Sequence, residues 1–318
     1  MPIDEAIGGR LQLLQGISRD DLLPSPTPEA LDAMMAAFAP VDGWQPPPAS
    51  TEEVMAFHPD GQVRVRVYRP PSGKPEDVGL VWLHGGGFAG GDLEMAEADG
   101  IARELIARTR ATIISVDYRL ARGEVHFPAP HDDAHSAWLW AAAGSEELGI
   151  APGRLLIGGA SAGANLATGV ALRLRDEGRP QPNRLLLAYP TLHLDYVAPC
   201  DPPVELAAIP PLLRFESKAI RGLYENYLGG ADPDPYAVPG MADPTGLAPT
   251  VILTCEYDDL RGSGEAFAKA LRAAGTEVTE RFSPGVTHGH LNIAGLPAND
   301  QALRFLASSL NEAADRRP

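Results

Sequence analysis

Cysteine is nearly absent from this chain of 318 residues, which contains only Cys200 and Cys255. Two cysteines cannot build a disulfide framework, and Cys255 lies in the apolar run 251–255, where a free thiol behaves as a small core side chain. The chain also has no apolar run of about 18 residues, and its first residues have neither a basic flank nor an apolar segment. We therefore expect no disulfide scaffold, no thiol catalysis, no membrane insertion and no secretory signal, which favours a cytoplasmic protein.

Positive charge is also scarce. The sequence has 26 Lys and Arg residues against 42 Asp and Glu residues, so its net charge is −16. A surface of this sign repels the phosphates of nucleic acids and anionic lipid headgroups, which argues against nucleic-acid and membrane partners. Glycine and proline, by contrast, are abundant, with 33 and 31 residues, and they predict many turns and loops.

Short apolar runs alternate with longer amphipathic stretches along most of the chain. A hairpin comes first, because Val63, Val65 and Val67 alternate after the turn signal Asp60-Gly61. The apolar runs that follow are 78–84, 111–118, 154–159, 184–190, 250–258 and 276–282, and helices are predicted over 95–109, 132–143, 162–177, 263–274 and 299–314. Strands that alternate with helices predict an α/β fold, in which helices cover both faces of a mostly parallel sheet.

Two stretches interrupt this alternation. Residues 1–50 contain two helical pieces, and residues 191–246 contain Pro-rich turns around an amphipathic segment, 212–228. Open α/β sheets bind their ligands beyond the carboxyl ends of the strands. We therefore expect the two stretches to form a cap over that edge, with the catalytic core in residues 51–190 and 247–318.

The strongest chemical signal is Gly159-Ala160-Ser161-Ala162-Gly163, which follows a predicted strand and opens a predicted helix. A serine on such a turn takes a strained backbone conformation, and only small neighbours let the strand and the helix approach each other. Every neighbour from Gly158 to Ala164 is glycine or alanine. We predict that Ser161 is a nucleophile; the alternative is an ordinary helix cap.

The second signal is His84-Gly85-Gly86-Gly87-Phe88, at the end of another predicted strand. Consecutive glycines let backbone N–H groups converge on one point, where they can stabilise an oxyanion. The glycines of the stretch 85–90 also match the GxGxxG pattern of dinucleotide-binding proteins. We favour the oxyanion hole, because the loop continues through Asp92 where the dinucleotide pattern needs a helix, and because His84 and Phe88 crowd the pyrophosphate position.

An acid and a base are needed to activate such a serine. In α/β hydrolases the order along the chain is serine, acid, histidine, with the acid after a late strand and the histidine after the last one. Asp258 ends an apolar run in this position, and His288 follows the last predicted strand. We predict these two residues as the acid and the base, with Asp259 and His290 as their rivals.

A metal site is the alternative interpretation of His131 and His135, which stand four residues apart on a predicted helix. The general-base glutamate of the zinc-protease motif is absent and no third ligand is evident, whereas Asp132 and Asp133 suit the positive end of the helix dipole. We predict a polar helix N-terminus here, with no metal and no other cofactor.

Together these motifs resemble the hormone-sensitive lipase-like esterases, a bacterial family of α/β hydrolases. The resemblance covers residues 60–310 and rests on the segments 84–88, 117–121, 159–167, 256–258 and 288–289. It implies the α/β-hydrolase fold, with a mostly parallel eight-stranded sheet under a helical cap. By position, it implies that Ser161 is the nucleophile, His288 the base and Asp258 the orienting acid. The oxyanion hole that it implies consists of the N–H groups of Gly85, Gly86 and Ala162.

Three positions depart from the family pattern. The family sequence DYRLAPE reads DYRLARGEVHFPAP here, Gly262 stands where a second acidic residue often follows, and His290 replaces a phenylalanine. The last two adjoin members of the predicted triad, so they change the polarity of the pocket more than its chemistry. We further predict that Phe88, Tyr189 and His290 contact the substrate.

The predicted function is hydrolysis of short- to medium-chain carboxylic esters through an acyl-enzyme on Ser161, with the chain length taken from the resemblance alone. The same triad also permits amide, carbamate or formamide hydrolysis. A further alternative is a non-catalytic small-molecule binding protein, since this fold includes receptors that lack the histidine; the presence of Ser161, Asp258 and His288 favours an enzyme. The expected partner is the ester substrate, and a homodimer is left open.

Overall fold

The computed structural model describes residues 2–18, 27–58, 61–201 and 206–315. In these ranges eight strands form one sheet in the order β1-β2-β4-β3-β5-β6-β7-β8. The strands are β1 (Ser50–His58), β2 (Gly61–Arg69), β3 (Gly79–Leu83), β4 (Thr112–Asp117), β5 (Leu155–Ala160), β6 (Leu185–Ala188), β7 (Thr250–Tyr257) and β8 (Val278–Thr287). Strand β2 pairs antiparallel with β1 and β4, and every other neighbouring pair is parallel. The predicted α/β fold with a mostly parallel sheet is confirmed.

The pattern of apolar residues in a strand matches the faces of the strand that are buried. Strands β3 and β5 are buried at every position, because helices cover both faces of the sheet there, and their sequences are apolar or small throughout. Next to the edge strand β1, β2 alternates instead: Val63, Val65 and Val67 are buried and the arginines between them are not. The predicted hairpin is present, although Asp60 of its turn signal lies outside the described residues.

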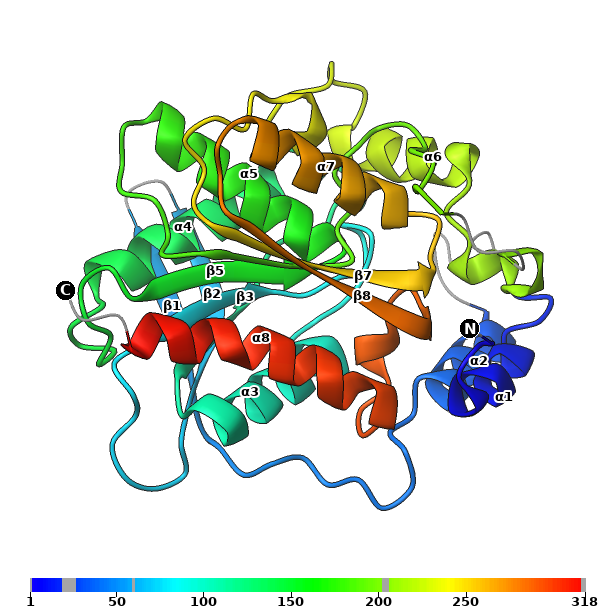
Figure 1. The fold of residues 1–318 in the computed structure, drawn as a ribbon, viewed down its shortest axis with the longest axis horizontal. Coiled ribbons are helices and arrows are strands. Elements are labelled where there is room, and N and C mark those ends of the chain that lie inside the picture. Colours follow the sequence, from blue (N-terminus) through cyan, green and yellow to red (C-terminus); the bar gives the residue numbers. More distant parts are fainter. Residues whose placement is uncertain (1, 19–26, 59–60, 202–205, 316–318) are drawn as a thin grey trace.

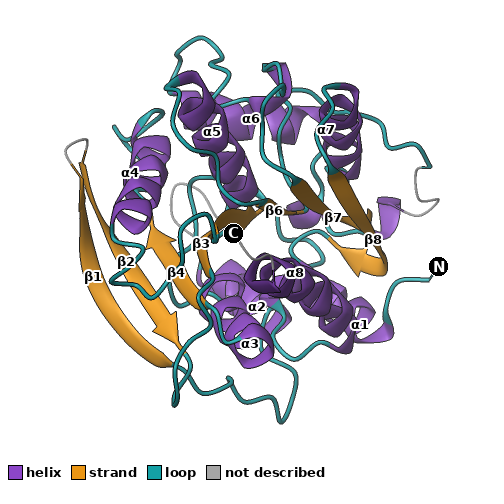
Figure 2. Cartoon of the chain, turned by 60° about the vertical axis from the view of Figure 1, so that its left-hand side comes forward, coloured by secondary structure: helices purple, strands orange, loops and turns teal. Residues whose placement is uncertain are grey.

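Helices cover both faces of the sheet, as Figures 1 and 2 show. Helices α4, α5 and α7 pack on one face, and α3 and α8 pack on the other. Their bounds, with those of the remaining helices, are α1 (Glu5–Leu13), α2 (Pro28–Ala37), α3 (Ile101–Thr109), α4 (Ala129–Ala143), α5 (Ala162–Asp176), α6 (Ser217–Leu228), α7 (Arg261–Ala273) and α8 (Pro297–Asp315). This layering is what strands alternating with helices predicted.

The two stretches that interrupt the alternation contain α1, α2 and α6. Leu14 after α1, Ala37 of α2 and Leu212 of the later stretch form a small apolar cluster of their own. Tyr224 and Tyr227 of α6 belong to the same buried cluster as many residues of the main core. Figure 1 shows α1 and α2, in blue, beside the arrowheads of β7 and β8. The N-terminal stretch and the later one therefore meet at the carboxyl ends of the strands.

Strand β8 is longer than predicted. The last strand was predicted over residues 276–282, but β8 continues to Thr287, so the predicted end of this strand is wrong. The pairing of β7 with β8 shifts its register between Cys255 and Tyr257, and this irregularity accommodates the extra residues. His288 consequently follows the end of a paired strand directly, which restricts the position of its backbone.

A π-helical turn, η1 (Ala96–Gly100), precedes α3 where the sequence predicts one continuous helix from residue 95. Turns of this kind are rare and occur often at functional sites. In this case the turn contains Glu97, whose side chain is buried.

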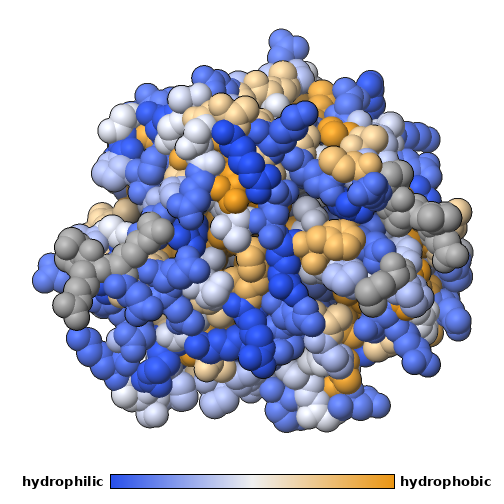
Figure 3. Space-filling model, in the orientation of Figure 1, coloured by the Kyte–Doolittle hydropathy of each residue, from blue (hydrophilic) through white to orange (hydrophobic). Residues whose placement is uncertain are grey.

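The surface matches the acidic composition. Figure 3 shows one face that is mostly hydrophilic, with apolar residues scattered over it. Among the described residues, α1 and α2 expose three large apolar side chains, Leu13, Leu31 and Met35. No described helix combines the length and the apolar character that crossing a membrane requires.

Candidate active site

Ser161 stands at the turn between β5 and α5. Its φ of 52° and ψ of −115° are strained for a residue other than glycine. Strand β3 makes the turn tight: a Cβ atom at Gly163 would come within 2.0 Å of the Leu83 carbonyl oxygen, and one at Gly159 within 2.5 Å. The small residues of the motif thus have a steric reason, and the turn presents the Ser161 side chain at the N-terminus of α5.

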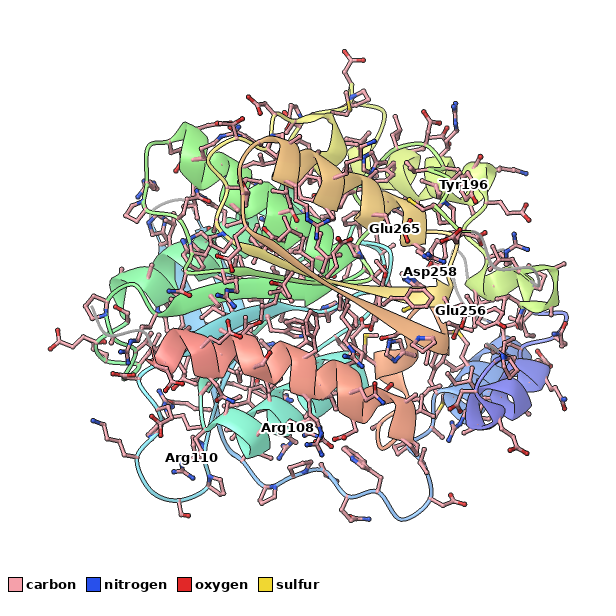
Figure 4. All side chains as sticks on the ribbon, viewed as in Figure 1. Arg108, Arg110, Tyr196, Glu256, Asp258 and Glu265 are labelled. Carbon is pink, nitrogen blue, oxygen red and sulfur yellow. The ribbon has the colours of Figure 1, made fainter. Side chains whose placement is uncertain are left out.

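His288 bridges Ser161 and Asp258. Its Nε2 lies 2.9 Å from Ser161 Oγ, and its Nδ1 lies 2.8 Å from Asp258 Oδ2. Because a carboxylate can only accept, Nδ1 carries the proton and Nε2 is the acceptor for the serine hydroxyl. The other carboxylate oxygen, Oδ1, accepts the N–H of Leu260 at 2.8 Å, which holds Asp258 in place at the end of β7 (Figure 4). The three residues predicted as nucleophile, base and acid therefore form one hydrogen-bonded chain.

The rival acid, Asp259, has other partners. Its Oδ2 accepts the N–H of Phe215 at 2.7 Å and the Nε of Arg214 at 2.8 Å, and its Oδ1 accepts Arg214 Nη2 at 3.2 Å. The ring of Phe215 then lies against His288, with 4.6 Å between the ring centroids. Of the two adjacent carboxylates, one contacts His288 and the other attaches a segment of the stretch 191–246 to the site.

The glycine loop requires a correction. The N–H of Gly85 donates to Oε2 of Glu97 at 2.7 Å, so it is already paired with a buried carboxyl group. In the described part of the chain, no hydrogen bond occupies the backbone N–H of Gly86, Gly87 or Ala162. Gly86 and Gly87 have φ angles of 116° and 60°, which glycine adopts without strain. The prediction that Gly85 donates to an oxyanion is therefore wrong, and Gly87 takes its place as a candidate donor.

His84 and Tyr118 support the glycine loop. Nδ1 of His84 lies 2.7 Å from the carbonyl oxygen of Gly85, and the Tyr118 hydroxyl donates to the carbonyl oxygen of His84 at 2.8 Å. The two rings stack with their centroids 4.4 Å apart. Burial lowers the pKa of His84, so the neutral ring donates its single N–H to the Gly85 carbonyl.

Known proteins resemble this chain over most of its length. Residues 80–292, more than half of the chain, match the family described as the α/β hydrolase fold. The chain belongs to the α/β-hydrolase fold family. It is 37% identical over 253 residues to the carboxylic ester hydrolase LipN of Mycobacterium tuberculosis, an alignment that covers 77% of this chain and 65% of LipN. It is 31% identical over 325 residues to the ethyl acetate hydrolase of Pseudomonas putida, which covers 98% and 99% of the two chains.

A solved structure agrees with the fold of this α/β hydrolase. The hyperthermophilic esterase from the archaeon Pyrobaculum calidifontis has a TM-score of 0.79 and 28% sequence identity, and the match covers 99% of both chains. Together with the family match, these relatives confirm the predicted resemblance to the hormone-sensitive lipase-like esterases.

The three side chains that we predicted to contact the substrate of this hydrolase are enclosed by other residues. Phe88 is 0% exposed, and its ring stacks on Tyr227 with the centroids 3.8 Å apart. His290 is 0% exposed, and its Nδ1 lies 2.6 Å from Oδ1 of Asn299; burial lowers its pKa to about 4. Tyr189 is 1% exposed. Ser161, at 6%, retains more exposure than any of these three, so the structure argues against direct substrate contact and indicates that they pack behind the site.

Acidic residues beside the motifs that we rejected as metal and dinucleotide sites pair with arginines in the hydrolase fold. Asp133 accepts both the backbone N–H and the guanidinium of Arg119. A dinucleotide site would also need an acidic residue at the end of the next strand, and Asp117, which stands there at the end of β4, accepts Arg64 Nε at 2.9 Å. The first helical turn after the glycine loop begins only at Ala96, so no helix starts where the GxGxxG pattern requires one.

Gly262 allows the stretch 191–246 to approach α7 closely. A Cβ atom at this position would lie 2.0 Å from the carbonyl oxygen of Val197. The acidic side chain that the family pattern places here would collide with that backbone. Glu265, labelled on α7 in Figure 4, adds a second attachment, because its Oε2 accepts the N–H of Cys200 at 2.9 Å.

Sequence reasoning missed two residues that border the site of this hydrolase. Glu97 belongs to a predicted amphipathic stretch, where a glutamate is expected on the solvent side. Phe215 lies in the predicted amphipathic segment 212–228, where an apolar side chain is expected to pack in the cap and nothing marks it as a neighbour of the site. Near Glu97 in the sequence, only the small residues Ala96 and Ala98 are consistent with burial. Alanine pairs of this kind are too common to predict that a glutamate between them is buried.

Proposed function

We propose that this protein hydrolyses short- to medium-chain carboxylic esters through an acyl-enzyme on Ser161, with His288 as the base and Asp258 as the acid that orients it. The observation that carries the proposal is the hydrogen-bonded chain from Ser161 Oγ through His288 to Asp258. A serine hydroxyl is a weak nucleophile, and a histidine whose tautomer is set by a carboxylate supplies the base it needs. The relatives named carboxylic ester hydrolase and ethyl acetate hydrolase support the same class of reaction.

The reaction proceeds in two halves. Ser161 Oγ attacks the ester carbonyl carbon while its proton passes to Nε2 of His288. The bond to the alcohol oxygen breaks as Nε2 gives this proton to the alcohol, which leaves the acyl group on Oγ. A water molecule then attacks the acyl carbon and gives a proton to Nε2, and the acid departs as Oγ recovers that proton. Asp258 stays ionised throughout and stabilises the imidazolium.

The oxyanion formed in each half is stabilised by backbone N–H groups. We assign this role to Gly86, Gly87 and Ala162. Ala162 is the first residue of α5, where N–H groups have no partner within the helix and the helix dipole is positive. The N–H groups of the two glycines, which follow His84 in the sequence, have no hydrogen-bond partner in the described chain. Removal of one such donor costs about 3–4 kcal/mol of transition-state stabilisation in serine hydrolases.

A cap formed by residues 1–50 and 191–246 over the core 51–190 and 247–318 completes the proposal. The apolar cluster shared by the N-terminal helices and the later stretch supports it, as does the ring of Phe215 beside His288. An aromatic ring at the imidazole restricts the room for acyl and alcohol groups, which favours shorter chains. The cytoplasmic location stays a prediction from the sequence, and a homodimer is left open.

Covalent labelling and turnover test the proposal together. A fluorophosphonate probe should label the wild type at Ser161, and Ser161→Ala should abolish both the label and the hydrolysis of p-nitrophenyl acetate and butyrate. Ser136→Ala is a matched control, because Ser136 is another buried serine whose hydroxyl has no partner in the described structure. The control should keep both activities.

Two results would redirect the assignment. A wild type that is neither labelled nor active contradicts the proposed enzyme and favours a binding protein. Turnover of matched anilides as fast as that of the esters would move the assignment to amide hydrolysis on the same triad.

A further inference from the structure

The carboxyl group of Glu97 takes no part in the steps above, yet it is buried beside them. Its Oε2 accepts the N–H of Gly85 at 2.7 Å. Its Oε1 accepts the hydroxyl of Tyr189 at 2.5 Å and the side-chain amide of Asn292 at 3.1 Å. Burial of a carboxyl group is costly unless its oxygens are satisfied. Both oxygens of Glu97 are satisfied, so the fold holds this group in one defined orientation.

The three partners of Glu97 come from three separate segments of the site. Gly85 begins the glycine loop after β3, Tyr189 follows β6, and Asn292 ends the short turn η5 (His290–Asn292). That turn follows His288 almost directly, and the ring of Tyr189 meets the ring of His288 edge-on at 5.0 Å. One side chain therefore joins the loop of proposed oxyanion donors to both segments that border the proposed base.

The glycine loop needs restraints of this kind, because glycine has little conformational preference of its own. Both peptide groups of Gly85 are restrained: Glu97 accepts its N–H, and Nδ1 of His84 lies 2.7 Å from its carbonyl oxygen. Glu97 also packs against this residue, since a Cβ atom at Gly85 would lie 2.3 Å from Oε2. The carbonyl of Gly85 and the N–H of Gly86 share one peptide plane. Holding Gly85 therefore sets the direction of the first proposed oxyanion donor.

We propose that Glu97 is a positioning residue for ester hydrolysis, which sets the directions of the Gly86 and Gly87 N–H groups relative to Ser161 and His288. This inference rests on the proposed esterase function. Donors that point slightly away from the oxyanion lose more of their interaction with the charged intermediate than with the neutral ester carbonyl. Loss of Glu97 therefore lowers kcat and leaves KM nearly unchanged.

The electrostatics of the group agree with this role. Burial raises the pKa of Glu97, which favours its neutral form. A neutral carboxyl group keeps the same three partners, because its O–H can donate to Tyr189 while its oxygens accept the N–H groups of Gly85 and Asn292. It also places no negative charge behind the developing oxyanion. Glutamine should consequently replace Glu97 better than alanine does, since it keeps an acceptor for Gly85.

The test compares wild type, Glu97→Gln and Glu97→Ala on p-nitrophenyl butyrate and on a trifluoromethyl ketone, which forms a tetrahedral adduct with a nucleophilic serine. For Glu97→Ala we expect kcat to fall about 100-fold and the ketone Ki to rise about 100-fold, with KM within about 2-fold of wild type. For Glu97→Gln we expect both changes to be about 5- to 10-fold. A purely structural loss would not move kcat and the ketone Ki together while sparing KM.

Glu104→Ala is a matched control from the same stretch of chain. Glu104 also receives hydrogen bonds from elsewhere in the fold, from Trp44 Nε1 at 3.1 Å and from Arg108, and it does not touch the glycine loop. This variant should lower the Tm without changing the ketone Ki.

Three results would overturn the inference. The first is a kcat for Glu97→Ala within about 3-fold of wild type. The second is the same change in ketone Ki in Glu97→Ala and Glu104→Ala. If Glu97→Ala does not fold, Glu97→Gln decides, and an unchanged kcat and ketone Ki in that variant contradict the inference. An unlabelled, inactive wild type would instead be a failure of the proposed esterase function, so the two failures are distinguishable.

Discussion

Replacing Asp259 with asparagine tests how Phe215 is held against His288. Asp259 is 4% exposed and receives the Phe215 N–H and two nitrogens of the Arg214 guanidinium. Asparagine has nearly the same shape but only one acceptor oxygen and no charge. If the asparagine oxygen still accepts the Phe215 N–H, the NH2 group of the asparagine faces Arg214. One hydrogen bond from Arg214 is then lost, because the NH2 group and the guanidinium are both donors.

The magnitude follows from this exchange. Hydrogen bonds to charged groups contribute about 1.5–3 kcal/mol and neutral ones about 1 kcal/mol, so the attachment should weaken by about 2 kcal/mol. Because about 1.4 kcal/mol corresponds to a factor of ten, the segment that carries Phe215 should open about 30-fold more often in Asp259→Asn than in wild type. Its ring would then leave His288 uncovered for a larger fraction of the time.

Hydrogen exchange of the Phe215 amide is the direct assay. We expect it to exchange about 30-fold faster in Asp259→Asn, and we expect KM for p-nitrophenyl butyrate to rise, because a wall of the site is less well held. Glu216→Gln is the matched control, since Glu216 lies 3.2 Å from the same Arg214 but its side chain is 69% exposed. Exposed pairs contribute less than about 1 kcal/mol, so this variant should resemble wild type. Equal exchange of the Phe215 amide in Asp259→Asn and wild type would refute the reasoning.

Three further predictions concern other residues around the site. Asp258→Asn should lower kcat about 10⁴-fold with an unchanged far-UV circular dichroism spectrum, because the amide favours the wrong tautomer of the histidine; a loss below about tenfold would contradict its assignment as the acid. Gly262→Asp should lower the free energy of unfolding in urea by about 1–3 kcal/mol, because its Cβ would lie 2.0 Å from the Val197 carbonyl oxygen; an unchanged midpoint would argue against that contact. Burial lowers the pKa of His290 from 6.5 to about 4, so between these pH values the unfolded chain binds more protons than the folded chain. The free energy of unfolding of the wild type should therefore fall by up to about 3 kcal/mol as the pH drops from 6.5 to about 4. His290→Phe should lose this part of the pH dependence in denaturation series at about pH 7 and pH 4.5, and an unaltered slope would show that His290 does not titrate as its burial requires.

The parts of this hydrolase that could be predicted from sequence depend on neighbouring residues. The turn at Ser161 needs small residues on both sides, and those residues stand next to it in the chain. The strands β3 and β5 are apolar on both faces, so short unbroken apolar runs identified them. The order of serine, acid and histidine then restricted the partners of Ser161 to a few positions at strand ends. Such features are local, and a single sequence contains them in full.

The π-helical turn and the end of β8 show where local reasoning fails. The register shift between Cys255 and Tyr257 lets β8 continue to Thr287. Because this shift arises in the pairing of β8 with β7, the periodicity of the β8 sequence does not predict it. Likewise, the sequence pattern predicts that Glu97 is a surface residue of an amphipathic helix. Its burial arises because segments from elsewhere in the chain supply the hydrogen bonds that a carboxyl group needs.

The sequence by itself determined the fold class, the family and a short set of residues for the chemistry, because each of these depends on the pattern of adjacent side chains. Only the tertiary structure decided which of two adjacent carboxylates faces His288, and that the Gly85 N–H is already paired. Those choices depend on contacts such as the one between Asn292 and Glu97, which are 195 residues apart in the chain. Packing of loops at the carboxyl edge of the sheet sets their geometry, and no spacing along the sequence encodes it.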